Sequence, residues 1–211
     1  MPFVLSVSGS LLLLASLSAA EPEYRLTDSD LELVSIDSSA TESFLSMRAD
    51  TSGRLFVSAR EAVFVYEPDG KGGLLPRCEL YRFPADSWVY DIEVRGSDLY
   101  AMTNRALYLL PGAVTKRSGI TPRRLIWGHP DYHPHQCFHG LAWGPDGDLY
   151  LSLGDMLVFY GDFTRPDHWG HWTFFCQPEG TRVPFTGVGG VLRCRPDGSQ
   201  LRVVARGTRN S

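Results

Sequence analysis

Three stretches of the chain decide the fold: FLSMRADTSGRLFVSA (residues 44–59), WVYDIEVRGSDLYAMT (88–103) and FHGLAWGPDGDLYLSL (138–153). In each, an aromatic residue stands eleven positions before the leucine of a leucine–aromatic pair, with a polar or glycine-containing turn between them. Such a strand–turn–strand pattern is typical of a β-hairpin. The shared spacing predicts one hairpin repeated three times, in which Phe44, Trp88 and Phe138 start the innermost strands and Leu55, Leu99 and Leu149 are equivalent.

A further apolar segment follows each hairpin. These segments are AVFVYEPDG (62–70), RALYLLPG (105–112) and, after a long insertion, GGVLRCRPDG (189–198). The Asp-Gly endings favour turns, because glycine adopts positive φ and aspartate bonds back to its own backbone. Units of roughly forty to fifty residues with three or four short strands are typical of propeller blades. A plain antiparallel sandwich also has short, regularly spaced strands, but the common register favours an all-β, partial β-propeller.

The repeats also predict how the chain is organised. Blades begin near residues 44, 88 and 138, whereas closed propellers usually have about four to eight blades. We therefore expect about three blades from the N-terminal part of a longer protein, with an open edge that is prone to aggregation alone. The predicted segments are a signal peptide (1–20), an N-terminal lead-in (21–42) and the partial propeller (43–211).

The first twenty residues, MPFVLSVSGSLLLLASLSAA, resemble an export leader. Their apolar run is short for a membrane span, and small residues at its end suit cleavage after Ala20. No lysine or arginine precedes the run, so an upstream start or an uncleaved anchor stays open. We expect a secreted or periplasmic protein.

Charge and cysteine content exclude several classes of function. The formal net charge is -4, and the short basic cluster of Lys116, Arg117, Arg123 and Arg124 gives no footprint for nucleic acid. The cysteines form neither a CxxC nor a CxxCH motif, so the sequence predicts neither a zinc knuckle nor a covalent haem site. In an oxidising compartment up to two disulfides could form, with undetermined pairing, among Cys78, Cys137, Cys176 and Cys194.

Histidines gather in one part of the sequence. All six lie between residues 129 and 171: His129, His133, His135, His139, His168 and His171. In the aligned hairpins, His139 takes the place of Leu45 and Val89, so it is predicted to line the propeller channel. This concentration favours a site, although a single loop histidine is usually structural or solvated.

Two other interpretations of this region remain. His133 and His135 with His168 or His171 could bind zinc or copper, but they lack a carboxylate partner, and we predict no metal site. The aromatic residues of the insertion could stack on a sugar or a cofactor ring, or simply pack the insertion on the propeller: Trp169, Trp172, Phe174 and Phe175.

Two motifs carry a resemblance to a known family. HQCFHGLAWGPDGDLYLSLGD and GGVLRCRPDGSQLRVVARGTRN resemble the soluble glucose, aldose and sorbosone dehydrogenases, propeller enzymes that use pyrroloquinoline quinone (PQQ). The first two hairpins and REAVFVYEPDGKGG look closer to large secreted bacterial proteins of the membrane-bound dehydrogenase type. In those proteins, helical repeats and a CxxCH haem domain follow the propeller. The strong part of the match covers residues 133–210.

The resemblance implies a six-bladed propeller that oxidises a sugar or a similar small molecule with PQQ. By motif, His135 would be the general base and Arg209, with Asn210 beside it, would bind the cofactor and stabilise negative charge on the reduced quinone. These roles suit an imidazole that titrates near neutral pH and a guanidinium that stays charged. His139 competes for the role of base, because Gln136, Cys137 and Phe138 stand where the family has a Gly-Gly-Arg type segment.

The family's calcium ligands and later cofactor-binding residues would fall beyond Ser211. We therefore expect this chain to be inactive alone and to act as a quinone-dependent sugar dehydrogenase only in a longer protein, which could carry a haem domain. The alternative is a noncatalytic propeller module that binds carbohydrate or a protein partner through the histidine-rich, aromatic face.

Overall fold

The computed structural model describes most of the predicted propeller. The chain divides into two compact units, Met1–Ser38 and Ser39–Ser211. The described residues are 27, 35–37, 41–128, 138–154, 173–185 and 189–208. They form antiparallel strands and turns, and this part of the chain includes no helix long and apolar enough to cross a membrane.

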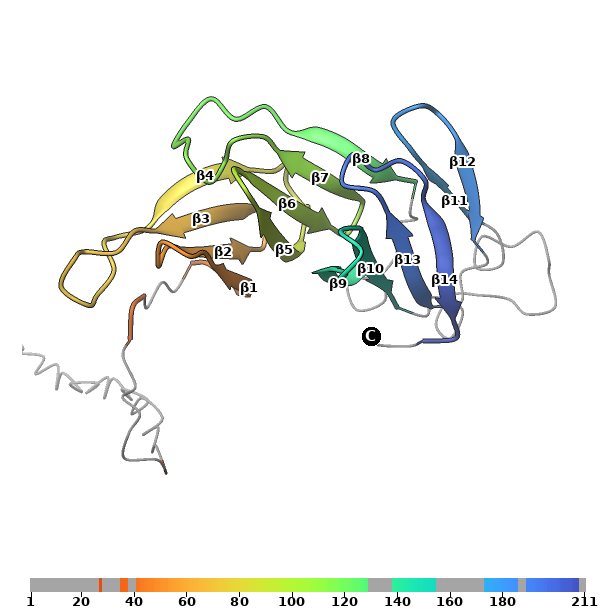
Figure 1. Cartoon of the computed structure of the whole chain (residues 1–211). Coiled ribbons are helices and arrows are strands. Elements are labelled where there is room, and N and C mark those ends of the chain that lie inside the picture. Colours follow the sequence, from red (N-terminus) through yellow and green to blue (C-terminus); the bar gives the residue numbers. More distant parts are fainter. Residues whose placement is uncertain are drawn as a thin grey trace, which may run out of the picture. The chain divides into compact units, whose positions relative to one another are not determined.

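Three antiparallel sheets follow one another along the second unit, and each contains a blade of four strands (Figure 1). The first blade comprises β1 (Phe44–Ala49), β2 (Leu55–Ala59), β3 (Ala62–Tyr66) and β4 (Cys78–Arg82). The second comprises β5 (Val89–Arg95), β6 (Asp98–Thr103), β7 (Ala106–Leu110) and β8 (Arg123–Trp127). The third comprises β9 (Phe138–Trp143), β10 (Leu149–Leu153), β13 (Gly190–Cys194) and β14 (Arg202–Arg206).

Successive blades pack face to face through two apolar layers. Side chains such as Phe56, Val63 and Val65 of blade 1 pack against blade 2, and Tyr100, Leu107 and Leu109 of blade 2 pack against blade 3. A sandwich would instead place all strands in two facing sheets. The serial packing of three meandering sheets confirms the prediction of an all-β, partial β-propeller.

Strand pairing confirms that the three leucines are equivalent. Leu55 pairs with Tyr66, Leu99 with Leu110, and Leu149 with Cys194, each on the third strand of its blade. Phe44 and Phe138 start β1 and β9 as predicted, but β5 starts at Val89 and not at Trp88.

The second hairpin is offset because its turn is shorter. Four residues separate Val94 from its partner Leu99, whereas five separate Ala49 from Leu55 and Trp143 from Leu149. Val89 is therefore equivalent to Phe44 and Phe138. The predicted equivalence of His139 with Val89 is wrong: the register shift in each inner strand makes His139 equivalent to Leu45 and Tyr90.

Aspartate side chains stabilise several of the turns, and the one at Asp197 is a turn that the Asp-Gly endings predict. Asp50 Oδ1 accepts hydrogen bonds from the backbone N–H groups of Ser52 and Arg54, at 2.8 and 3.1 Å. Asp197 accepts from Ser199 N–H at 2.9 Å. Gly198, which follows Asp197, has φ +85°, and a Cβ there would lie 2.9 Å from the Leu125 backbone oxygen. Glycine is therefore required at this turn both for its conformation and for its close contact with blade 2.

The insertion of blade 3 adds a hairpin to blade 2. Strands β11 (Thr173–Cys176) and β12 (Arg182–Phe185) extend the second sheet, whose order becomes β12-β11-β8-β7-β6-β5. Phe175 is fully buried, with its ring centroid 5.8 Å from that of Phe138. Packing is thus the role of this aromatic residue. The hairpin covers the outer edge of β8 and holds blades 2 and 3 together.

The described cysteines are free thiols: Cys78, Cys176 and Cys194. Cys137 lies outside the described residues. Burial raises the pKa of the Cys194 thiol to about 12, so this side chain acts as a small core residue and not as a nucleophile.

Candidate functional site

The predicted site residues divide into a described and an undescribed group. His139 lies in β9 and is half-buried. His135, Arg209 and Asn210 lie outside the described residues, as do the other four histidines, Trp169 and Trp172. Their predicted roles stay predictions.

His139 continues a line of neighbouring side chains across the three blades, with its ring tilted by 50° against that of Tyr90. Its ring centroid lies 5.8 Å from that of Tyr90 in β5, and Tyr90 stacks on Trp88 at 6.0 Å with an interplanar angle of 25°. The Arg60 guanidinium, from the β2–β3 turn, lies 4.3 Å from the Trp88 ring centroid. We call these four residues, Arg60, Trp88, Tyr90 and His139, the ring ladder. Cation, indole, phenol and imidazole therefore lie side by side, and groups of these kinds are suited to contact with a flat or ring-shaped ligand.

Backbone contacts fix the position of Trp88. Its N–H donates to Asn104 Oδ1 at 3.2 Å, and its carbonyl accepts from Asn104 N–H at 3.0 Å. Asn104 Nδ2 donates to the Asp86 carbonyl at 3.1 Å, and Val89 N–H donates to the Arg60 carbonyl at 3.1 Å. The loop that carries Trp88 is therefore bonded to turns of both blade 1 and blade 2. A ligand that binds the ladder would meet a surface that is already ordered.

The segment that leads to Arg209 ends beside the start of β9. Thr208 Oγ1 donates to the Leu153 carbonyl at 3.3 Å, and Gly207 N–H donates to the Gly189 carbonyl at 2.6 Å. Leu153 pairs with Phe138, the residue before His139. The described end of β14 and the ring ladder therefore meet the same end of blade 3.

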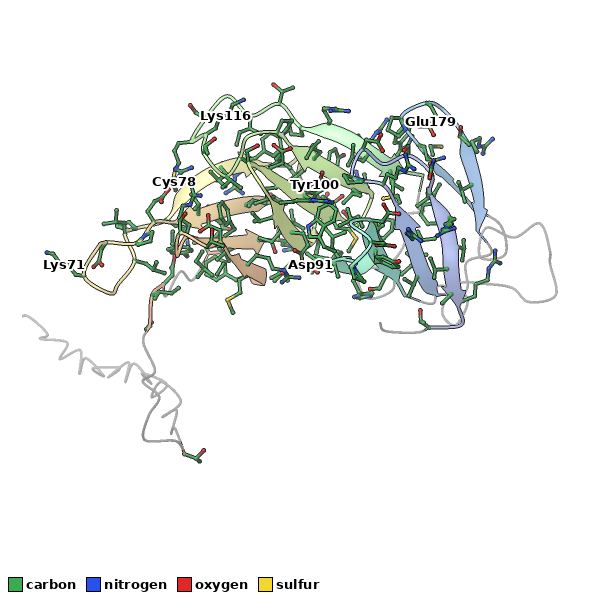
Figure 2. All side chains as sticks on the ribbon, in the orientation of Figure 1. Lys71, Cys78, Asp91, Tyr100, Lys116 and Glu179 are labelled. Atoms are coloured by element: carbon green, nitrogen blue, oxygen red, sulfur yellow. The ribbon has the colours of Figure 1, made fainter. Side chains whose placement is uncertain are left out.

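A charged network lies next to the ladder, where β1, β5 and β9 come together (Figure 2). Asp91 is 7% exposed; its carboxylate accepts from Ser46 Oγ at 2.5 Å and from Leu141 N–H at 2.8 Å. Arg48 Nη2 lies 3.0 Å from Asp91 Oδ1, and Arg48 Nε donates to Glu93 at 2.7 Å. Burial by itself lowers the pKa of Arg48, but Glu93 and Asp91 outweigh it and raise that pKa. The guanidinium therefore stays charged.

Metal binding finds no support in the described part of the chain. There, no group of three or more His, Cys, Asp or Glu side chains could hold an ion. The predicted alternative with His133 and His135 falls outside the described residues.

Sequence reasoning missed most of the ladder and the whole charged network. Trp88 was predicted only as the start of a strand, and Arg60, Tyr90 and Asp91 carried no signal by themselves. A comparison of the turn lengths would have aligned Tyr90 with His139. No sequence pattern would have paired Asp91 with Leu141, because the two belong to different sheets.

No protein-family model matches the chain, and no curated protein matches it. Among solved structures, virginiamycin B lyase from Staphylococcus aureus is similar with a TM-score of 0.41 and 12% identity, covering 76% of this chain and 54% of the lyase. A streptogramin B lyase matches with a TM-score of 0.40 and 13% identity, over 76% of this chain and 53% of the lyase. PorZ, a surface component of the type-IX secretion system of Porphyromonas gingivalis, matches with a TM-score of 0.34 and 13% identity, over 77% and 30%.

The chain spans about half the length of the two lyases. Assignment to the β-propellers rests on the three blades themselves, and identities of 12–13% say nothing about a shared activity.

Proposed function

We propose that this chain is the N-terminal part of a secreted, quinone-dependent sugar dehydrogenase-like propeller that becomes active only with further blades. The observation that carries the proposal is the bond from Thr208 to Leu153. It brings the segment before Arg209 to the blade end where β9 presents His139. A base and an oxyanion stabiliser must converge on one substrate, although some seventy residues separate them in sequence.

The described residues fit part of a PQQ site. PQQ is a planar polycarboxylate: the Trp88 and Tyr90 rings would stack on such a ligand, and the Arg60 guanidinium suits its carboxylates. When bound, PQQ supplies a two-electron acceptor. His139 or His135 would remove the proton of a sugar hydroxyl, and Arg209 with Asn210 would stabilise developing negative charge. Calcium and a haem domain stay expectations from the resemblance alone.

Kinetics of the full-length gene product test the proposal. A general base typically contributes about 10²–10⁴-fold in rate, so His139→Ala or His135→Ala should lower quinone-dependent sugar oxidation by that factor, whichever is the base. Arg209→Ala should lower the rate as well. Lys71→Ala is the control, because this exposed residue lies in the β3–β4 connection and should leave the rate unchanged. Failure to bind PQQ, or unchanged oxidation in both histidine variants, would sink the enzyme hypothesis.

The ring ladder also favours a second function: noncatalytic binding of a carbohydrate. Stacking on an ordered ring surface needs neither a base nor a cofactor. In that case Trp88→Ala should weaken sugar binding measured by calorimetry by roughly tenfold, while His135→Ala and Arg209→Ala change it little. Trp127→Ala is the matched control. The Arg124 guanidinium lies 4.4 Å from the Trp127 ring centroid, but Trp127 belongs to β8 and not to the ring ladder.

A further inference from the structure

We propose that Asp91 is a positioning residue that holds β9 against β5 and thereby keeps the His139 imidazole against Tyr90. The importance of His139 rests on the proposed function. Its orientation by Asp91 does not, and can be measured by itself.

The need for such a residue follows from the sheet order. β5 and β9 belong to different sheets, and β9 is the edge strand of its own sheet, β14-β13-β10-β9. Sheet pairing therefore cannot fix β9 relative to β5. Leu141 in β9 is 2% exposed, and a buried edge N–H needs an acceptor from outside its sheet. Asp91 Oδ2 is that acceptor, at 2.8 Å.

The Asp91 carboxylate is itself held from several directions. Oδ1 accepts from Ser46 Oγ at 2.5 Å and from Ile92 N–H at 2.9 Å. Arg48 Nη2 approaches Oδ2 at 3.2 Å, and Arg48 is in turn fixed by Glu93. Both oxygens are therefore occupied by donors from β1, β5 and β9. Because Asp91 belongs to β5 and binds groups of β1 and β9, its carboxylate fixes these inner strands relative to one another.

Geometry along the strands links this bond to the ladder. Tyr90 directly precedes Asp91, and His139 stands two residues before Leu141. A slip of β9 relative to β5 would change the contact between the Tyr90 and His139 rings, now 5.8 Å apart. In blade 3 the position equivalent to Ser46 and Asp91 is Gly140, which has no side chain for this task.

The other end of the same two strands offers a matched control. Arg95, the last residue of β5, donates from Nη1 to the Gly147 carbonyl at 2.6 Å, and its guanidinium lies 4.3 Å from the Trp143 ring centroid. These contacts also join blades 2 and 3, but they lie at the end of β9 away from His139. Loss of Arg95 should destabilise the blade interface without rotating the imidazole.

Nuclear magnetic resonance on the intact chain compares Asp91→Asn with Arg95→Ala. The asparagine is nearly isosteric, but its NH₂ group would face a donor, so the bond network loses an acceptor. Because a hydrogen bond to a charged group is worth about 1.5–3 kcal/mol, the Leu141 amide should exchange at least about tenfold faster in Asp91→Asn. The ring-proton shifts of His139, assigned with His139→Gln, should move as the Tyr90 ring current is lost. Arg95→Ala should lower the urea midpoint and leave both signals near their original values.

Two results would overturn the proposal: a protected Leu141 amide with unchanged His139 shifts in Asp91→Asn, or equal shifts in Arg95→Ala.

If Asp91→Asn does not fold, Ser46→Ala takes its place, because it removes one bond to Asp91 and adds no group. Its Leu141 amide should exchange roughly two- to tenfold faster, and no change would contradict the proposal. If the shifts move but His139→Ala leaves sugar oxidation intact, the dehydrogenase proposal fails while the positioning role stands.

Discussion

The two faces of blade 3 differ sharply in burial, although they come from the same strands. In blade 3, Phe138, Leu151 and Leu192 face blade 2 and are fully buried. On the opposite face Val191 is only half-buried, and in β14 Val204 is 52% exposed. A cavity of about 230 Å³ opens between residues of β9, β10 and β13, and Asp91 of β5 also lines it.

In blade 1 the buried face is the one that points to the following blade, whereas in blade 3 it points to the preceding blade. Val63 and Val65 of blade 1 are fully buried against blade 2, whereas Met47 is 63% exposed on the other side. The residues equivalent to Met47 in the next two blades, Ile92 and Leu141, are 0% and 2% exposed. At this inner-strand position, burial therefore follows the presence of a neighbouring blade. Val57 and Phe64, which share the face of Met47, are nevertheless buried, at 7% and 4% exposed. Equivalent substitutions on a covered and an open face should have unequal effects.

The largest difference is expected at the start of the inner strands. Phe138→Ala removes a fully buried ring and should lower the free energy of unfolding by about 3–5 kcal/mol. Phe44→Ala, at the equivalent position, should cost less than about 1.5 kcal/mol, because Phe44 is already 39% exposed. Urea unfolding followed by tryptophan fluorescence measures both. Equal losses would mean that the open face of blade 1 is covered in solution.

A smaller difference is expected in the third strands, where the same substitution is possible twice. Val63→Ala should cost about 2 kcal/mol, since it deletes two buried methyl groups and leaves a small cavity. Val191→Ala should lower the free energy of unfolding by less than about 1 kcal/mol, because half-exposed methyl groups contribute less hydrophobic stabilisation to begin with. The same urea titration compares them, and a greater loss for Val191→Ala would contradict the assigned faces.

The smallest difference concerns two aspartates in equivalent turns. Burial raises the pKa of Asp50, but hydrogen bonds from Arg54 and Ser52 outweigh it and lower that pKa. Arg54 also donates to the Val114 carbonyl of blade 2 at 2.5 Å, so this turn belongs to a covered face. Because the folded pKa lies below the unfolded one, the stabilisation is complete near pH 7 and is lost as the pH falls below about 4.

Asp50→Asn should therefore lower stability by about 1 kcal/mol or less at pH 7, and the difference from the unmodified chain should shrink below about pH 4. Asp146→Asn is the matched variant on the open face, where Asp146 pairs with Arg193 at 2.7 Å in a solvent-exposed cluster. We expect a smaller effect there, because water screens the pair. Urea midpoints from pH 3 to pH 7 show whether the difference in stability between each variant and the unmodified chain depends on pH.

Part of the candidate site was predictable and part was not. The sequence identified His139 because it interrupts an apolar position in a repeated hairpin, and the structure places it on β9 beside another blade. It also singled out His135, Arg209 and Asn210, whose roles remain predictions. Trp88, Tyr90 and Asp91 were not assigned to the site, because their contacts cross from one blade to another.

By itself, the sequence determined the repeated hairpins, the equivalence of Leu55, Leu99 and Leu149, and the aspartate turns. These features depend on spacing and turn chemistry among residues close together in the chain, so a local pattern contains them. Tertiary structure alone decided that β11 joins β8, that Tyr90 meets His139 and that Asp91 binds the Leu141 N–H group. Each of these joins segments that are far apart in the sequence, and their partners are selected by the packing of whole blades, which no single stretch of sequence encodes.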